Sequence, residues 1–272
     1  MLADRLVCVW AQRIDRDAGT YRQSVLPDGC VDIVWIGKAA PVVAGPATRR
    51  IVVGLPAGAN VIGARFRPGA AAGALGLPAD ELLNQDVPLA EMWGNDADRI
   101  TEEIFQHDSE SQRLCAMSSG LAARLAAAPE SNPFVRAAAA WLARRPQHRV
   151  RELARSLGLS ERQLHRRFCA AVGYGPKMFQ RIMRFQRLLA SSAAEASIHR
   201  NLADLANAVG YADHAHMCRE VYAFADAAPQ DVLRRRGSTL AMSDLFNTGG
   251  SPGDYSAHLD HSSSGEVLWN HE

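Results

Sequence analysis

The sequence has no hydrophobic run of roughly 18 residues, the length that a membrane-spanning helix requires. Its start, MLADRLVCVW, is too charged for a signal peptide, and the apolar part is too short. These absences predict a cytoplasmic protein with no membrane partner.

The sequence also lacks the groupings of cysteine and histidine that a metal site or a catalytic nucleophile requires. The five cysteines never form a C-x-x-C pair, and their odd number and scatter indicate reduced thiols: Cys8, Cys30, Cys115, Cys169 and Cys218. No histidine precedes His107, so a Cys-His pair at Cys30 has no nearby partner. We therefore predict an inert or ligand-lining role for Cys30, no metal and no cofactor.

Charge is present but unevenly distributed. The net charge is +1, yet residues 134–240 carry +10, residues 1–133 carry −4 and residues 241–272 carry −5. Basic charge concentrated in one segment is typical of a module that binds a polyanion.

Residues 1 to about 67 read as β structure. Six short runs rich in Val, Ile and aromatic residues are separated by Gly, Pro, Asp or Asn: LVCVW, YRQSVL, CVDIVWI, PVVAG, IVVGL and VIGARF. Six such strands can close a small barrel or form a sheet with one covered face. Helical patterns then extend to Ala128, and PESNP at residues 129–133 breaks them.

A helix-turn-helix pattern occurs twice between Arg149 and Pro229. The first copy runs from Arg151 to Phe168 and the second from Leu202 to Val221. At an offset of 52, Leu153, Ala154 and Gly158 recur as Leu205, Ala206 and Gly210. Each glycine supplies the positive φ that ends a helix, and Ser160 and Asp213 are the expected caps of the helices that follow.

The side chains on the outward face of each second helix are the candidate DNA contacts, because a short exposed helix with basic residues fits a major groove. In the first copy they are Arg162, His165, Arg166 and Arg167. In the second copy they are His214, Ala215, His216, Cys218 and Arg219. On the helix between the copies, Arg181, Arg184 and Arg187 are expected to be phosphate contacts or solvated charges.

The paired units resemble the AraC/XylS family of transcription regulators over roughly Phe134 to Arg236. The resemblance rests on the long connecting helix, the Gly210-Tyr211 turn, and Pro229 eight residues after Val221. Val221 departs from the phenylalanine that the family usually has there. The resemblance implies two recognition helices in successive major grooves on one face of double-stranded DNA. It also implies RNA polymerase and a second copy of the chain as candidate partners.

The N-terminal half has a weaker resemblance. The segments LPDGCVDIVW, RFRPGAAAGALGLPADEL and DVPLAEMW are similar to the N-terminal domain of an uncharacterised subgroup of these regulators. The similarity implies a two-domain layout and brings no known ligand.

Four residues are candidates for binding a small effector in the N-terminal domain. Arg65 and Arg67 alternate along one strand and so point to the same side. They could hold an anionic effector, or pair with Asp28 or Asp32 across the sheet. Trp10 and Trp35 could line a pocket, with core packing as the alternative.

We therefore predict an α+β chain of two domains and a tail. Residues 1–130 form a sensor or dimerisation domain, a small β-barrel or sheet with following helices. Residues 131–240 form an all-α DNA-binding domain with two helix-turn-helix units joined by a long helix, and residues 241–272 form a disordered acidic tail. The predicted function is sequence-specific transcription regulation without enzymatic activity. The alternative is a DNA-binding enzyme, such as an alkylation-repair protein with a cysteine acceptor.

Overall fold

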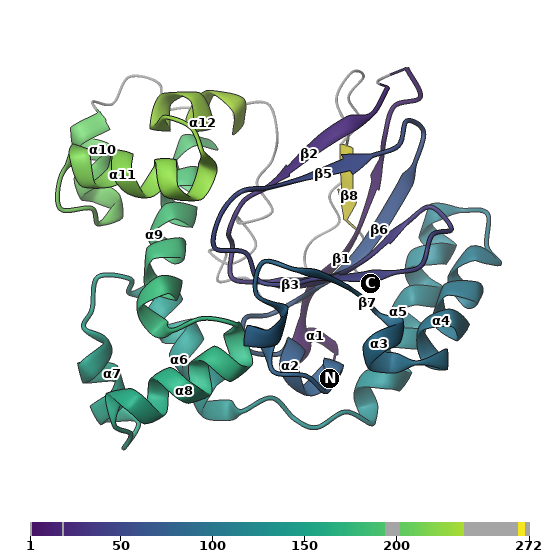
Figure 1. Ribbon diagram of the computed structural model, residues 1–272, viewed down its shortest axis with the longest axis horizontal. Helices are drawn as coiled ribbons and strands as arrows, with labels where there is room; N and C mark the ends of the chain where they lie inside the picture. The colour runs from purple at the N-terminus through teal and green to yellow at the C-terminus, as the bar shows by residue number, and fades with distance from the viewer. Residues whose placement is uncertain (1, 18, 194–201, 237–265, 270–272) are drawn as a thin grey trace.

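The computed structural model describes residues 2–17, 19–193, 202–236 and 266–269. Figure 1 shows strands and helices in the N-terminal half and helices alone from α6 to α12. Among the described residues, no helix combines the length and the hydropathy that crossing a membrane takes.

The N-terminal half contains all six strands that the sequence predicts. They are β1 (Leu6–Arg13), β2 (Tyr21–Val25), β3 (Val31–Ile36), β4 (Val42–Ala44), β5 (Ile51–Leu55) and β6 (Asn60–Phe66). A seventh strand, β7 (Asp86–Pro88), pairs with β4 and was not predicted. The strands form a sheet in the order β7-β4-β3-β6-β1-β8 and a separate pair β2-β5. The β structure of the described residues is therefore an open sheet with a second small sheet, and these strands do not close into a barrel.

The tail departs from the prediction at one point. Glu266–Trp269 form β8, which pairs antiparallel with β1. The expectation of a disordered tail is therefore wrong for these four residues. The reason is that β1 would be an edge strand without β8, and an edge strand offers unpaired N–H and C=O groups to an extended segment. The rest of the predicted tail from 241 lies outside the described residues.

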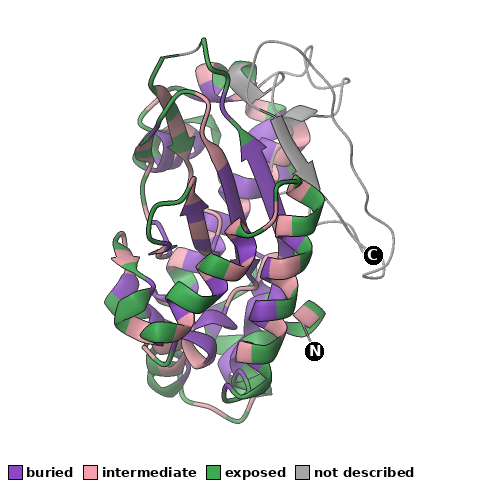
Figure 2. Cartoon of the chain, turned by 90° about the vertical axis from the view of Figure 1, so that its right-hand side faces the viewer, coloured by how far each residue is buried: buried purple, intermediate pink, exposed green. Residues whose placement is uncertain are grey.

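Helices cover one face of the large sheet and enclose the N-terminal core. Their bounds are α1 (Leu2–Arg5), α2 (Ala71–Leu75), the 3-10 helix η1 (Ala79–Leu82), α3 (Ala90–Trp93), α4 (Asn95–Phe105) and α5 (Glu110–Ala126). Ile33, Trp35 and Phe66 from the strands meet Ile100 and Leu121 from α4 and α5, and all five are fully buried. Figure 2 shows buried residues along the strands and exposed ones on the outward sides of the helices.

The described residues between 133 and 236 form a helical region. Its elements are α6 (Pro133–Arg144), α7 (Val150–Ser156), α8 (Glu161–Val172), α9 (Pro176–Ala193), α10 (Leu202–Val209), α11 (His214–Ala225) and α12 (Pro229–Arg236). In Figure 1, α9 stands between the pair α7/α8 and the pair α10/α11. Leu164, Phe168, Phe185, Met217 and Val221 come from both pairs and from α9, and they share one buried cluster. The predicted α+β class and the two helix-turn-helix units joined by a long helix are confirmed.

The two halves are joined by packing as well as by the chain. The side-chain amide of Gln186 on α9 donates to the carbonyl oxygen of Pro27, in the turn before β3. Gly29 in the same turn lies against Phe179, so that an added Cβ would stand 2.9 Å from the Phe179 ring. The turn between β2 and β3 therefore rests on the helix that connects the two helix-turn-helix units.

Candidate nucleic-acid interface

The first unit folds as its local sequence dictates. Gly158 has a φ of +67°, which ends α7 with a residue that carries no Cβ. Ser160 caps α8 by accepting the amide of Gln163 at 3.2 Å, and the Gln163 side chain accepts the Ser160 amide at 3.0 Å. This reciprocal capping box fixes where α8 begins. Leu164 and Phe168 are fully buried, which turns the opposite side of α8 outward.

The outward side of α8 carries the predicted contacts of the first unit. Arg162, His165 and Arg166 are exposed, and Arg167 is half-buried. The His165 ring lies over Gly175, where an added Cβ would be 2.5 Å from Nε2, and it also contacts the Cys169 thiol at 3.6 Å. His165 is thus held along the helix, whereas no ion pair holds Arg162 or Arg166 among the described residues.

The second unit repeats this construction with a different cap. Gly210 has a φ of +98° and ends α10. Asp213 caps α11 by accepting the His216 amide at 2.6 Å. His214, Ala215 and Arg219 are exposed on α11, and Cys218 is half-buried beside His214, with 3.5 Å between Sγ and Nε2.

His216 lies apart from this exposed set. Its Nδ1 accepts the Ala212 amide at 3.3 Å, and its Nε2 lies 3.5 Å from Glu220. The side chain is 31% exposed, so the imidazole faces the protein with most of its surface. His216 therefore joins the turn of the second unit to the buried carboxylate of Glu220.

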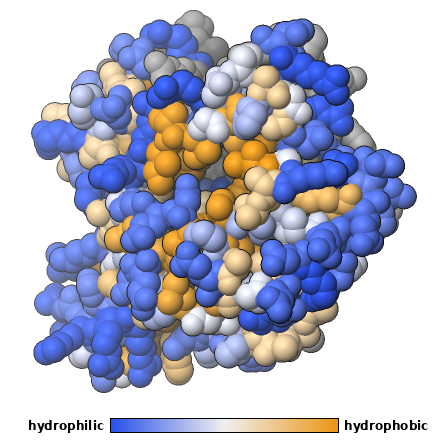
Figure 3. Space-filling model, turned by 45° about the vertical axis from the view of Figure 1, so that its right-hand side comes forward, coloured by the Kyte–Doolittle hydropathy of each residue, from blue (hydrophilic) through white to orange (hydrophobic). Residues whose placement is uncertain are grey.

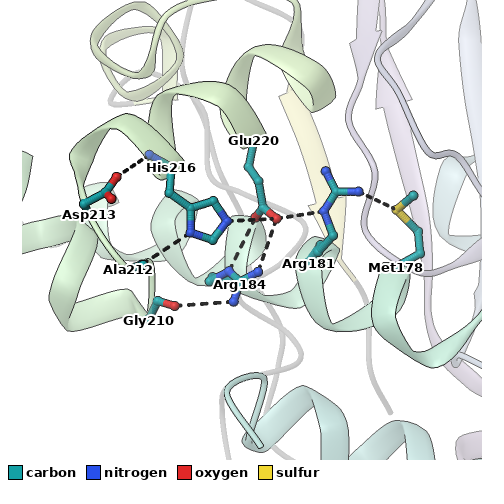
Figure 4. Close-up of polar contacts among 8 residues, drawn as sticks. All are labelled: Met178, Arg181, Arg184, Gly210, Ala212, Asp213, His216 and Glu220. Atoms are coloured by element: carbon teal, nitrogen blue, oxygen red, sulfur yellow. Dashed lines mark hydrogen bonds and ion pairs between the residues drawn. The ribbon is translucent and has the colours of Figure 1, made fainter. Parts of the chain in front are cut away.

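Glu220 ties α11, the second helix of the second unit, to α9 (Figure 4). Its carboxylate accepts Arg181 Nε at 2.7 Å and Arg184 Nη2 at 3.2 Å. The Glu220 side chain is only 6% exposed, against 39% for Arg181 and 13% for Arg184. A buried carboxylate needs such partners, and here two cations and His216 supply them. Arg187, the third arginine of α9, instead donates to the carbonyls of Ala143 and Arg144 at the end of α6.

Two residues of α11 that the sequence analysis did not select are prominent here. Glu220 interrupts the apolar spacing of Met217, Val221 and Phe224, and a charge on a buried face signals a partner on the facing helix. Tyr222 is 62% exposed and lies three residues after Arg219, on the outward side. Continuing the outward spacing by one turn would have identified Tyr222.

In the N-terminal half, the effector candidates divide between two faces of the sheet. Arg65 is buried between Asp28, at 2.8 Å, and Asp32, at 2.7 Å, which confirms the predicted pairing across the sheet. The two carboxylates raise the pKa of the guanidinium, against the lowering by burial. Trp10 shares the face of Arg65, because it pairs with Gly63, two residues along β6.

The other two candidates lie elsewhere. Trp35 pairs with Ile62 on the opposite face, is fully buried, and donates its indole N–H to Thr101 at 2.9 Å. Arg67 follows the end of β6 and donates to the Ala3 carbonyl at 2.8 Å. The Trp10 indole N–H is buried without a hydrogen-bond partner among the described residues.

Figure 3 shows hydrophobic residues gathered in the middle of one face of the molecule, with hydrophilic residues around them.

The cysteines of the N-terminal sheet sit beside the Arg65 ion pairs. Burial raises the pKa of the Cys30 thiol well above its ordinary value, and Asp28 raises it further. Burial likewise raises the pKa of Cys8 to about 12. A high pKa keeps a thiol protonated and weakly nucleophilic. No group of three or more His, Cys, Asp or Glu side chains in the described ranges is placed to hold a metal ion.

Comparison with protein families decides what the paired units are. Residues 153–235, from α7 into α12, match the family described as "Helix-turn-helix domain". The chain carries an AraC-type helix-turn-helix domain. Residues 1–88 match the family described as "Domain of unknown function (DUF6597)". The AraC-type domain identifies the chain as a DNA-binding transcription regulator, with a sheet-containing domain in front.

Solved structures give a distant likeness to this AraC-type protein. An apo variant of ToxT from Vibrio cholerae strain SCE256 is 12% identical with a TM-score of 0.45, over 83% of this chain and 96% of that one. ToxT from Vibrio cholerae O395 is 10% identical with a TM-score of 0.44, over 83% and 96%. A P21 crystal form of ToxT from Vibrio cholerae is 10% identical with a TM-score of 0.45, over 83% and 97%. No curated protein matches the sequence.

Proposed function

We propose that this regulator binds a specific site on double-stranded DNA by placing α8 and α11 in successive major grooves. The observation that carries the proposal is the pair Arg162 and Arg166. Both are exposed on a helix whose start is fixed by a capping box and whose other side is fully buried. Arginine side chains held on a rigid helix can take guanine O6 and N7 in a bidentate pair.

The proposed contacts divide by chemistry. Arg162, Arg166, Arg167 and Arg219 supply charge for phosphates and guanine, and His165, His214 and Cys218 supply further polar groups. Ala215 is small enough to lie against a thymine methyl group. His216 belongs to the proposed set through its place at the start of α11, and its bonds to Ala212 and Glu220 support a positioning role there.

The N-terminal domain is proposed to regulate DNA binding by sensing a small effector or by pairing two copies of the chain. Trp10, Trp35, Arg65 and Arg67 remain the proposed effector residues. The unpartnered indole N–H of Trp10 and its place on the face of Arg65 favour Trp10 among them. RNA polymerase is the further partner that the AraC-type domain suggests. We also propose a cytoplasmic location, because the proposed partner is DNA.

An enzyme that uses a cysteine acceptor has less support. Cys8 and Cys30 are buried and have raised pKa values, so neither thiol is poised to attack a substrate. We propose a regulator without catalytic activity.

Selection of bound sequences from a random DNA pool with the full chain tests the proposal. We expect an enriched site with two blocks about one helical turn, 34 Å, apart. Repetition of that pair would show that two copies bind. A single block would limit base reading to α8. Binding without enrichment, falling steeply with salt, would contradict sequence-specific regulation.

A further inference from the structure

A basic cleft opens between the first helix-turn-helix unit and α9. Its volume is about 470 Å³, and its charged lining consists of Arg149, Arg151, Lys177, Arg181, Arg184 and Glu161. None of the cleft's basic residues belongs to the outward set of α8 or α11. The basic charge of the cleft is therefore separate from the outward faces of α8 and α11.

Three of these cations are free to bind an outside anion. Arg149, Arg151 and Lys177 are exposed, and no ion pair with an acidic side chain involves them within the described residues. Arg181 and Arg184 already share Glu220, so their charge is partly neutralised. The cleft thus keeps an excess of positive charge after its internal pairs are formed.

The cleft lies between the start of α8 and the part of α9 that holds α11. Glu161, the first residue of α8, forms one part of its lining. Arg181 and Arg184 form another part and hold Glu220 of α11. In helix-turn-helix complexes the first residues of the recognition helix contact the bases. With α8 and α11 in successive grooves, a cleft between the start of α8 and the α9 side chains that hold α11 would face the DNA between those grooves.

The wall of the cleft is held in place before any ligand arrives. Gln180 on α9 is 8% exposed and donates its side-chain amide to the His148 carbonyl at 2.6 Å. This bond fixes the segment between α6 and α7, which carries Arg149. The cations are thus presented on a fixed frame, which lowers the entropy cost of binding.

We propose that this cleft binds backbone phosphates of the DNA segment that lies between the two major grooves. The inference rests on the proposed function, because it assumes that α8 and α11 occupy successive grooves. Phosphate contacts give affinity and register without reading bases, and a cleft of arginine and lysine side chains suits that task. The cleft would clamp the backbone while the two helices select the sequence.

The composition of the chain allows a direct test, since Lys38 and Lys177 are its only lysines. Lys38 is exposed in the N-terminal half, far in sequence from the cleft, and serves as the internal control. Lysine acetylation of the full chain, followed by mass spectrometry, measures both reactivities with and without the selected DNA site. We expect DNA to protect Lys177 several-fold and to leave Lys38 unchanged.

Salt titration of two matched variants gives a second readout. Lys177→Gln should reduce the slope of log K against log salt by about 0.9, the value for one phosphate contact. It should weaken all DNA sequences equally, and Lys38→Gln should change neither quantity. The proposal for the cleft would be wrong if Lys177→Gln left the salt slope unchanged and DNA did not protect Lys177 from acetylation. If the protein still selected a DNA site, the proposed function would nevertheless hold.

Two further outcomes separate the sources of the phosphate. Protection of Lys177 by sodium pyrophosphate alone, at matched ionic strength, without protection by DNA would indicate a small-anion site and overturn the proposal. Failure of the wild-type chain to bind any DNA would overturn the cleft and the proposed function together.

Discussion

Gln186 and Pro27 are 159 positions apart in the sequence, yet the Gln186 side chain donates a hydrogen bond to the Pro27 carbonyl in a buried contact. Gln186 belongs to α9, the helix that sets the positions of both recognition helices. Pro27 belongs to the turn whose next residue, Asp28, pairs with buried Arg65. This contact places the N-terminal sheet and the spacing of α8 and α11 in one packed unit.

The close approach at Gly29 makes this junction sensitive to one methyl group. Gly29 has a φ of +88°, and an added Cβ would lie 2.9 Å from Phe179. We expect Gly29→Ala to lower the free energy of unfolding by about 1–3 kcal/mol, through backbone strain and overpacking. It should also weaken binding of the two-block site, because α9 must shift. Urea unfolding and DNA titration measure the two effects.

Gly37→Ala is the matched control for Gly29→Ala. Gly37 also has a positive φ, +54°, but an added Cβ there would meet nothing within 4 Å. Gly37→Ala should lower the free energy of unfolding by about 1–2 kcal/mol, through backbone strain alone. It should leave DNA affinity unchanged. Equal effects of the two variants on DNA binding would show that the junction does not influence the recognition helices.

Arg166 is expected to read one base of the first block. Arg166→Ala should cost roughly 1–3 kcal/mol of binding free energy at one base position and relax the preference there. Arg22→Ala, which removes an exposed arginine of β2 in the N-terminal half, should leave the preference intact. Binding to a panel of single-base variants measures both. If Arg166→Ala left affinity and preference unchanged, α8 would not be the helix that reads this block.

Glu220 should matter for the second block without touching DNA. Glu220→Gln leaves Arg181 and Arg184 without their buried counter-charge. We expect a loss of about 1–3 kcal/mol in unfolding free energy, below the range for fully buried pairs because Arg181 is 39% exposed. Selection should then retain the first block and lose the second.

Glu152→Gln on α7 is the control for the Glu220 variant, because Glu152 is exposed. It should change neither stability nor the selected site. A Glu220→Gln protein that still enriches both blocks would show that the position of α11 does not depend on this carboxylate.

Cys8 should make the protein sensitive to alkali. Burial raises the pKa of its thiol from 9.0 in the unfolded chain to about 12 in the native one. Above pH 9.0 the unfolded chain loses this proton while the native chain keeps it, so stability falls as pH rises toward about 12. Between these pH values, the free energy of unfolding should fall by about 1.4 kcal/mol per pH unit from this thiol.

Urea unfolding at about pH 8 and about pH 10.5 checks the alkaline effect. Cys8→Ala should reduce the fall in stability between the two conditions, because it removes one of the two buried titrating thiols and leaves Cys30. Cys115→Ala, at an exposed cysteine, should leave the fall unchanged. The same fall in both variants would mean that Cys8 does not titrate as its burial implies.

The sequence by itself determined the elements whose signals are local. The helix-turn-helix units follow from apolar spacing and from Gly158 and Gly210, because a positive φ is a property of one residue and its neighbours. The caps Ser160 and Asp213 act within three residues of themselves. The six N-terminal strands follow from β-branched runs between turn residues. The outward residues of α8 could therefore be identified from spacing alone.

Only the tertiary structure decided which hydrogen-bond or ion-pair partner each polar side chain has, where the sequence allowed several. Arg65 had Asp28 and Asp32 among its possible partners, and the register of β6 against β3 brings it to Asp32. Arg181 and Arg184 had solvent and phosphates as alternatives, and the packing of α11 on α9 gives them Glu220. The edge of β1 likewise took a strand from the tail, and the cleft beside Lys177 formed from three separate segments. Such contacts depend on residues distant in sequence, and no local period or turn signal specifies which distant groups will meet.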